Sequence, residues 1–369
     1  MQKNSKKIVI LGTGGTIAGH AADAKDVLGY TAGQVSVADL LARLPTANTP
    51  KTPTKAASEA TISGASVQAS AEAPPQFVSE QVAQIDSKDL DFPLWQQLAS
   101  RVEHHLAQSE VQGVVITHGT DTLEETAYFL HRVLAAACAH KPVVLTCAMR
   151  PASAAQADGP QNLSDALLLA QSPGARGVLV VCAGDVHSAL QVQKVHCSRL
   201  NAFDSGDASP LARIENATLT LRANWPTTPE KLANTAMAAI EDIAIGASWP
   251  RVEVLMNHAG ASGQMVDALW AANAGLPAPQ RVRGIVVAGT GNGSLHYALE
   301  AALLRAQAAG LRVLRATRCA YGQVQAKPGD ALPDSKGLSP VKARVELMLQ
   351  LIGAGPAALA TPMQQKPAR

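Results

Sequence analysis

The chain has 369 residues, of which 47% are hydrophobic and 16% are charged, and its formal net charge at pH 7 is +2. A chain of this length can bury a full core without disulfides or metal ions, in one large domain or two moderate ones. The small net charge, with no run of lysine or arginine longer than a pair, argues against a nucleic-acid or anionic lipid partner and favours a small-molecule ligand. The five cysteines are widely spaced and form no Cys-x-x-Cys pair, so we expect reduced thiols.

The N-terminus reads MQKNSKK, and only four apolar residues follow before Gly12. This apolar stretch is too short for the core of a signal peptide. No stretch approaches the roughly 20 apolar residues that span a bilayer. We therefore expect a cytoplasmic protein that does not bind membranes.

Short apolar runs rich in β-branched residues recur along the chain, with helical patterns between several of them. They lie at 8–11, 114–116, 143–145, 178–181 and 285–287. Continuous apolarity indicates strands covered on both faces, as in a parallel sheet with helical crossovers. The sequence therefore predicts an α/β fold, in which ligands bind beyond the carboxyl ends of the strands.

Two segments differ in texture from the rest. The segment 45–77 is rich in Thr, Ala, Ser and Pro, and we interpret it as a mobile surface insertion, with a substrate lid as the less favoured interpretation. The segment 226–250 has prolines near both ends and is predicted to link an N-terminal domain at 1–225 to a smaller α/β domain at 251–369. A last helix is expected over 340–352.

The first apolar run leads into GTGGTIAG, residues 12–19. A P-loop would need lysine and then serine or threonine after this stretch, but His20 and Ala21 stand there. The dinucleotide fingerprint would need glycine or alanine where Ile17 stands. The glycines let the backbone turn tightly, and the Thr16 hydroxyl can then stand above the sheet. The alternative is that Thr16 only caps a helix.

The second apolar run leads into THGTDT, residues 117–122, and then into a helical pattern. Thr122 and Glu125 have the spacing of a capping box, so the sequence predicts a structural role for Thr122. Thr120 and Asp121 are not needed for this cap and can face a ligand in the crevice. Threonines in two such loops and a carboxylate suggest covalent acyl chemistry on a ligand with a positive charge. A threonine nucleophile also needs a base close by.

Together, TGGTIAG and THGTDT resemble the two signature motifs of the bacterial L-asparaginases and glutaminase-asparaginases. The resemblance extends through CAMRP (147–151), ADGPQNL (157–163), GTGNGSL (289–295) and SPVKARVELMLQL (339–351). It implies a large N-terminal domain with a mostly parallel, flavodoxin-like sheet and a smaller C-terminal α/β domain. It also implies hydrolysis of L-asparagine to L-aspartate and ammonia through a threonine acyl-enzyme, weaker action on L-glutamine, and a homotetramer built as a dimer of dimers.

The resemblance also implies catalytic roles for individual residues. Thr16 takes the place of the nucleophile, and Tyr30 takes the place of the tyrosine on the mobile loop that assists it. Thr120 and Asp121 correspond to the second-motif pair, in which the aspartate binds the α-ammonium of the substrate. Lys194 is the nearest match to the lysine that hydrogen-bonds to the second threonine.

Further positions correspond to substrate-binding residues of the family. Ser87 lies in the segment that binds the substrate carboxylate, and Lys88 stands where a glutamine is common. Asn292 resembles an asparagine that a neighbouring subunit contributes beside the ammonium. Backbone N–H groups near the two threonines and Ala148 would form the oxyanion hole. The loop 321–337 has no glutamate, although family members often place one there.

The residues leave other interpretations open. Lys194 could be a solvated surface lysine, Tyr30 could simply pack, and Ser87 and Asn292 could be turn residues. The whole chain could be a non-catalytic amino-acid-binding module on the same fold. No metal site is predicted and no cofactor is expected, because the histidines at 104, 105, 187 and 196 lack ligand spacing.

Overall fold

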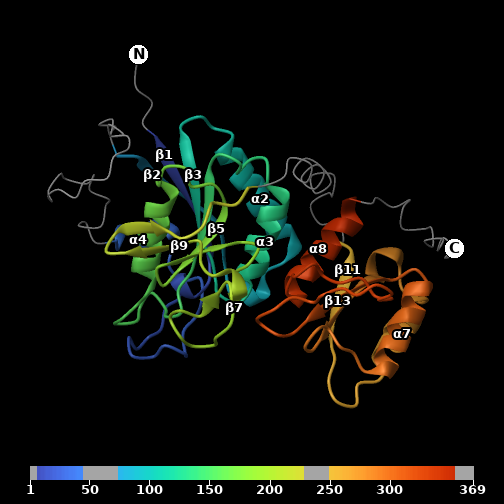
Figure 1. Cartoon of the computed structure of the whole chain (residues 1–369). Helices are drawn as coiled ribbons and strands as arrows, with labels where there is room; N and C mark the ends of the chain where they lie inside the picture. Colours follow the sequence, from blue (N-terminus) through green and yellow to red (C-terminus); the bar gives the residue numbers. More distant parts are fainter. Residues whose placement is uncertain (1–5, 45–73, 228–248, 354–369) are drawn as a thin grey trace.

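The computed structural model describes residues 6–44, 74–227 and 249–353 (Figure 1). In these ranges the chain forms a large sheet of eight strands in the order β10-β9-β6-β5-β4-β3-β1-β2, and a smaller sheet in the order β11-β12-β13. A two-stranded ladder joins β7 to β8. The strands are β1 (Lys7–Gly14), β2 (Gln76–Ile85), β3 (Val111–Thr117), β4 (Pro142–Thr146), β5 (Gly177–Cys182), β6 (Asp185–Ser188), β7 (Gln193–Lys194), β8 (Phe203–Asp204), β9 (Ala212–Glu215), β10 (Thr218–Leu221), β11 (Arg251–Met256), β12 (Val282–Gly289) and β13 (Arg312–Thr317).

The large sheet is parallel across the strands that carry the predicted motifs. Strands β2, β1, β3, β4 and β5 pair in parallel in that order, and β6, β9 and β10 extend the sheet in antiparallel pairing. The order 2-1-3-4-5 is that of the flavodoxin-like sheet. Each of the five predicted apolar runs lies in a strand of one of the two sheets, so the α/β prediction is confirmed.

Strand β2 is the one strand of the parallel set that the sequence analysis did not predict. It lies at the edge of the sheet, and none of its residues is fully buried. Polar residues therefore interrupt its sequence, and the continuous apolar run that marks the other strands is absent from it. Because β2 begins at Gln76, the insertion predicted over 45–77 ends before that residue. Residues 45–73 of the predicted insertion, and 228–248 of the predicted linker, lie outside the described ranges.

Helices cover both faces of the large sheet. The helices α2 (Phe92–Leu106) and α3 (Leu123–Val133) pack their apolar sides on one face, and α1 (Val37–Ala42) and α4 (Gly159–Ala170) pack on the other. Continuously apolar strands such as Pro142–Thr146 are buried along their whole length as a result. None of the described helices is long and apolar enough to cross a membrane.

The smaller sheet is sandwiched in the same way. Helices α6 (Gln264–Asn273) and α7 (Tyr297–Ala308) pack on one face, and α8 (Pro340–Gly353) lies on the other, in agreement with the helix predicted over 340–352. Helix α8 also packs against α3, so it lies between the two sheets (Figure 1). Polar contacts join α8 to α3: the Tyr128 hydroxyl donates to Glu346 at 2.9 Å, and Arg344 pairs with Glu125 at 3.8 Å.

Candidate active site

Four neighbouring parallel strands end at the same edge of the large sheet, and the predicted site residues follow them directly. Thr16 follows β1, Thr120 and Asp121 follow β3, Ala148 follows β4, and Ser87 follows β2. Strands β1 and β3 pair as far as Gly12 and Thr117, so the two threonine loops leave the sheet side by side. The strand order reverses between β1 and β3, and ligands bind at such a switch point in open α/β sheets.

The two threonine loops touch through their glycine backbones. Gly15 has φ of 78°, and a Cβ atom built on it would lie 2.2 Å from the Cα atom of Gly119. Only glycine satisfies both the positive φ and this approach. The third glycine of GTGGTIAG therefore brings the loop of Thr16 against the loop of Thr120.

Thr16 has one close side-chain partner. Its Oγ1 atom lies 2.7 Å from the Oη atom of Tyr30, and the Thr16 residue is only 7% exposed. The loop of Tyr30 is held by paired backbone hydrogen bonds between His20 and Thr31, both at 2.9 Å. The tyrosine ring also lies against Gly19, where an added Cβ atom would come within 2.7 Å of the ring. The structure thus brings together two residues that are separated by a loop in the sequence.

Thr120 and Asp121 share a cation. The Nζ atom of Lys194, in β7, lies 2.9 Å from Thr120 Oγ1 and 2.7 Å from Asp121 Oδ1. The Lys194 side chain is 22% exposed and that of Asp121 is 51% exposed, so the carboxylate faces solvent beside the pair. The lysine is therefore not a solvated surface residue, and it lies where it can act on the Thr120 hydroxyl.

Ser87 and Thr122 join the β2 and β3 loops. The backbone N–H of Asp121 donates to Ser87 Oγ at 3.2 Å, and the Thr122 hydroxyl donates to the Ser87 carbonyl at 2.8 Å. The predicted capping box is wrong, because Thr122 makes no side-chain capping bond to α3 and Glu125 instead faces Arg344. Both residues of the predicted capping box thus form tertiary contacts in place of the local capping bonds.

A buried hydrogen-bond chain that the sequence analysis missed runs from α2 to the second loop. The Trp95 indole N–H donates to Thr126 Oγ1 at 2.8 Å, Thr126 Oγ1 lies 3.0 Å from His118 Nε2, and His118 Nδ1 lies 2.7 Å from the Gly119 carbonyl. Because the carbonyl only accepts, Nδ1 carries the proton and Nε2 accepts from the hydroxyl. Burial lowers the pKa of His118 to about 4, so the ring is neutral at neutral pH. His118 therefore fixes the loop of Thr120 and is not a base for it.

The remaining predicted site residues do not join this cluster to the same degree. Ala148 is fully buried after β4. Lys88 is exposed and pairs with the Asp86 and Asp89 carboxylates at 2.7 and 3.1 Å. The Asn292 side chain, in the smaller α/β unit, makes two hydrogen bonds to the backbone of Gln325. Lys88 and Asn292 thus have partners outside the two threonine loops.

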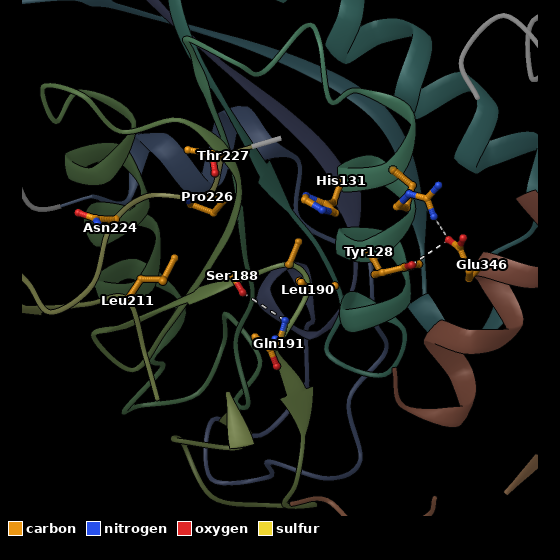
Figure 2. A pocket seen from close by; sticks show the side chains of 12 residues that line it. Tyr128, His131, Ser188, Leu190, Gln191, Leu211, Asn224, Pro226, Thr227 and Glu346 are labelled. Carbon is orange, nitrogen blue, oxygen red and sulfur yellow. Dashed lines mark hydrogen bonds and ion pairs between the residues drawn. The ribbon is translucent and has the colours of Figure 1, made fainter. Parts of the chain in front are cut away.

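One cavity lined by described residues lies elsewhere. It measures about 520 Å³ and is lined by residues of α3, α8 and the loops around β6, including Tyr128, Ser188 and Glu346 (Figure 2). None of the predicted site residues lines it. In the described ranges there is also no group of three or more His, Cys, Asp or Glu side chains that could hold a metal ion.

The chain matches two family models along most of its length. Residues 7–227 match the family model "Asparaginase, N-terminal", and residues 251–356 match "Glutaminase/Asparaginase C-terminal domain". It is 33% identical to L-asparaginase 2 of Bacillus subtilis, over 95% of this chain and 84% of that protein. It is also 33% identical to a glutaminase-asparaginase of Pseudomonas fluorescens, over 93% of this chain and 86% of that protein. A crystal structure of a probable cytoplasmic L-asparaginase from Campylobacter jejuni superposes with a TM-score of 0.78 at 33% identity, over 94% and 95% of the two chains.

Proposed function

Because the chain belongs to the asparaginase family, we propose that it hydrolyses L-asparagine to L-aspartate and ammonia through an acyl-enzyme on Thr16, with weaker action on L-glutamine. The observation that carries this proposal is the contact between the two threonine loops at Gly15 and Gly119. One loop presents a hydroxyl paired with Tyr30, and the other presents a hydroxyl paired with Lys194.

The acyl-enzyme forms when Thr16 Oγ1 attacks the side-chain amide carbon of the substrate. The hydrogen bond to Tyr30 gives the hydroxyl proton an acceptor as the new C–O bond develops. The C–N bond then breaks, and the nitrogen takes up the proton that Thr16 gave up and leaves as ammonia. Water attacks the resulting ester, which releases L-aspartate and restores the Thr16 hydroxyl. From the opposite loop, the positive charge of Lys194 lies beside the Thr120 hydroxyl and orients it toward the reacting groups.

Recognition of the amino-acid end of the substrate falls to Asp121 and Ser87. The half-exposed carboxylate of Asp121 suits an α-ammonium group, because a charge-assisted hydrogen bond is about twice as strong as a neutral one. Ser87 follows β2 and already contacts the backbone of Asp121, which suits it to the substrate carboxylate. Backbone N–H groups near the threonines and Ala148 would bind the oxyanion, and loss of one such donor typically costs about 10²–10³ in turnover.

We also propose the assembly that the resemblance implies. Domains at 1–225 and 251–369 would form one subunit of a homotetramer, and Asn292 of a neighbouring subunit would complete each site. In the single chain Asn292 contacts Gln325 and not the threonine loops, which suits a residue that serves another copy. Light scattering during size-exclusion chromatography would give the mass of four chains. The cytoplasmic location stays a prediction.

The test is ammonia release from the purified protein with L-asparagine and, separately, with L-glutamine. Thr16→Ala should abolish release, whereas Thr146→Ala, a buried threonine whose hydroxyl donates to the Val181 carbonyl, should keep it after correction for folded protein. If the wild-type protein binds L-asparagine but releases no ammonia, the non-catalytic binding module is the better description. Full turnover by Thr16→Ala would contradict the acyl-enzyme on that residue.

A further inference from the structure

A lysine of the smaller α/β unit is buried next to the segment that carries Lys194. Lys342, near the start of α8, is only 1% exposed. Its Nζ atom donates to the Leu190 carbonyl at 3.0 Å and also to the Val192 carbonyl. The contacts join positions about 150 residues apart in the chain. A helix of one unit thus holds the loop of the other unit that leads into β7.

A carboxylate of α3 also holds this segment. The Oε2 atom of Glu124, in the first turn of α3, accepts a hydrogen bond from the backbone N–H of Lys194 at 3.2 Å. Asp121, just before this helix, contacts the Lys194 side chain. Burial raises the pKa of Glu124, and the Lys342 cation counteracts this rise, so the lysine favours the charged carboxylate.

The burial of Lys342 lowers the free energy of unfolding unless the contacts of this lysine to the loop offset the cost. Burial lowers the pKa of Lys342 to about 8, which means that the folded chain disfavours the charged amine. A cation in the first turn of a helix also opposes the helix dipole. The ladder that contains Lys194 has only two residues on each strand, Gln193 and Lys194 against Phe203 and Asp204, so it provides little support of its own.

We propose that Lys342 and Glu124 are positioning residues that fix the backbone leading into Lys194 and so set its amine against Thr120. Lys342 holds the carbonyl of Val192, and Glu124 holds the amide of Lys194 itself. Through α8, the smaller unit thereby helps to order the active site of its own chain. Lys194 is an active-site residue only under the function proposed above, so the test separates the two proposals.

The test is a double-mutant cycle between Lys342→Met and Lys194→Met, read as turnover with L-asparagine. Misplacing the amine should lower the turnover of Lys342→Met by about 10- to 100-fold, since small displacements at a site cost that much. In the Lys194→Met background the same change should alter turnover by less than about 2-fold, because its target is gone. An effect of equal size in both backgrounds, or none in either, would overturn the proposal.

A matched control separates positioning from loss of fold. Lys141 also donates to two backbone carbonyls, those of Leu106 and Gln108 at 2.7 and 2.8 Å. It directly precedes β4, so it lies at the end of that strand opposite to the end where the site lies. Lys141→Met should keep wild-type turnover per folded molecule. Lys342→Arg, which retains a cation, should recover part of the activity that Lys342→Met loses.

A readout without catalysis completes the test. Hydrogen–deuterium exchange of the peptide over 190–195 should become at least 10-fold faster in Lys342→Met, while β1 keeps its protection. Unchanged exchange there would contradict the proposal even if activity falls. If Lys342→Met does not fold, Glu124→Gln enters the same cycle and the same exchange experiment. If the wild-type protein releases no ammonia, the proposed function fails, and the exchange experiment alone decides whether the two residues order the segment.

Discussion

Thr126→Val tests whether the buried chain from Trp95 to Gly119 holds the second threonine loop. Valine has nearly the shape of threonine but can neither accept from the Trp95 indole nor donate to His118 Nε2. Thr126 is fully buried, so water cannot replace the missing partner without a rearrangement. The substitution therefore leaves one donor and one acceptor unpaired.

The magnitude follows from these two groups. Each buried polar group without a partner costs about 1–3 kcal/mol, so Thr126→Val should lower the free energy of unfolding by about 2–6 kcal/mol. Thr126→Ser keeps the hydroxyl and loses one methyl group, which costs about 1 kcal/mol. The difference between the two variants isolates the chain of hydrogen bonds from the packing. Turnover should also fall in Thr126→Val, because His118 no longer has a fixed orientation against the Gly119 carbonyl.

Urea unfolding followed by tryptophan fluorescence and ammonia release would measure both effects. The midpoints of the two variants should be compared at one protein concentration, because the homotetramer proposed above would not unfold as a simple two-state monomer. If Thr126→Val matches Thr126→Ser in stability and in turnover, the chain of hydrogen bonds does not support the loop and the reasoning is refuted.

Three further predictions concern other parts of the site. Tyr30→Phe should lower turnover about 100-fold or more while thermal stability changes little, because it removes only the hydroxyl that pairs with Thr16; unchanged turnover would contradict its role. Gly15→Ala should prevent folding or destroy activity, whereas Gly174→Ala, with φ of 77° and open space around it, should cost only about 1 kcal/mol in thermal unfolding. Burial raises the pKa of Glu125 to about 7. Ionisation of this carboxyl therefore lowers the free energy of unfolding, by an amount that grows from about pH 4.5 and reaches its full value above pH 7. Glu125→Gln should therefore stabilise the protein by about 1–3 kcal/mol at pH 8 and by little at pH 5 in thermal unfolding, and an equal gain at both would refute the assignment.

The sequence predicts well those features that local patterns determine. The buried parallel strands are continuous apolar runs, and these runs are the pattern that predicts them. Glycines at 14 and 15 mark the tight turn after β1 because only glycine adopts the positive φ found there. The edge strand β2 is not predicted from the sequence, because its residues are half-buried and mixed in polarity. The contact between Tyr30 and Thr16 followed from the family resemblance and not from any periodicity.

Prediction from the sequence fails where a side chain binds a partner that is distant in the sequence. The Thr122 and Glu125 spacing is that of a capping box, yet the carbonyl of Ser87 and the guanidinium of Arg344 are the partners that the fold supplies. Local patterns describe what a segment can do by itself, and tertiary contacts then decide between that and a stronger alternative. Lys342 is the extreme case, because a lysine in a helical pattern is normally a solvated residue.

The two halves of the site differ in what keeps them in place. The loop of Thr16 is held by backbone packing of Gly15 against Gly119, which leaves no freedom for a small displacement. Lys194 lies in a two-residue ladder and depends on side chains from α3 and α8 for its position. Close backbone packing tolerates almost no change, whereas a few hydrogen bonds across an interface can be broken without loss of the core. The position of Thr16 therefore depends on the stability of the large sheet itself, whereas the position of Lys194 depends on the docking of the smaller unit.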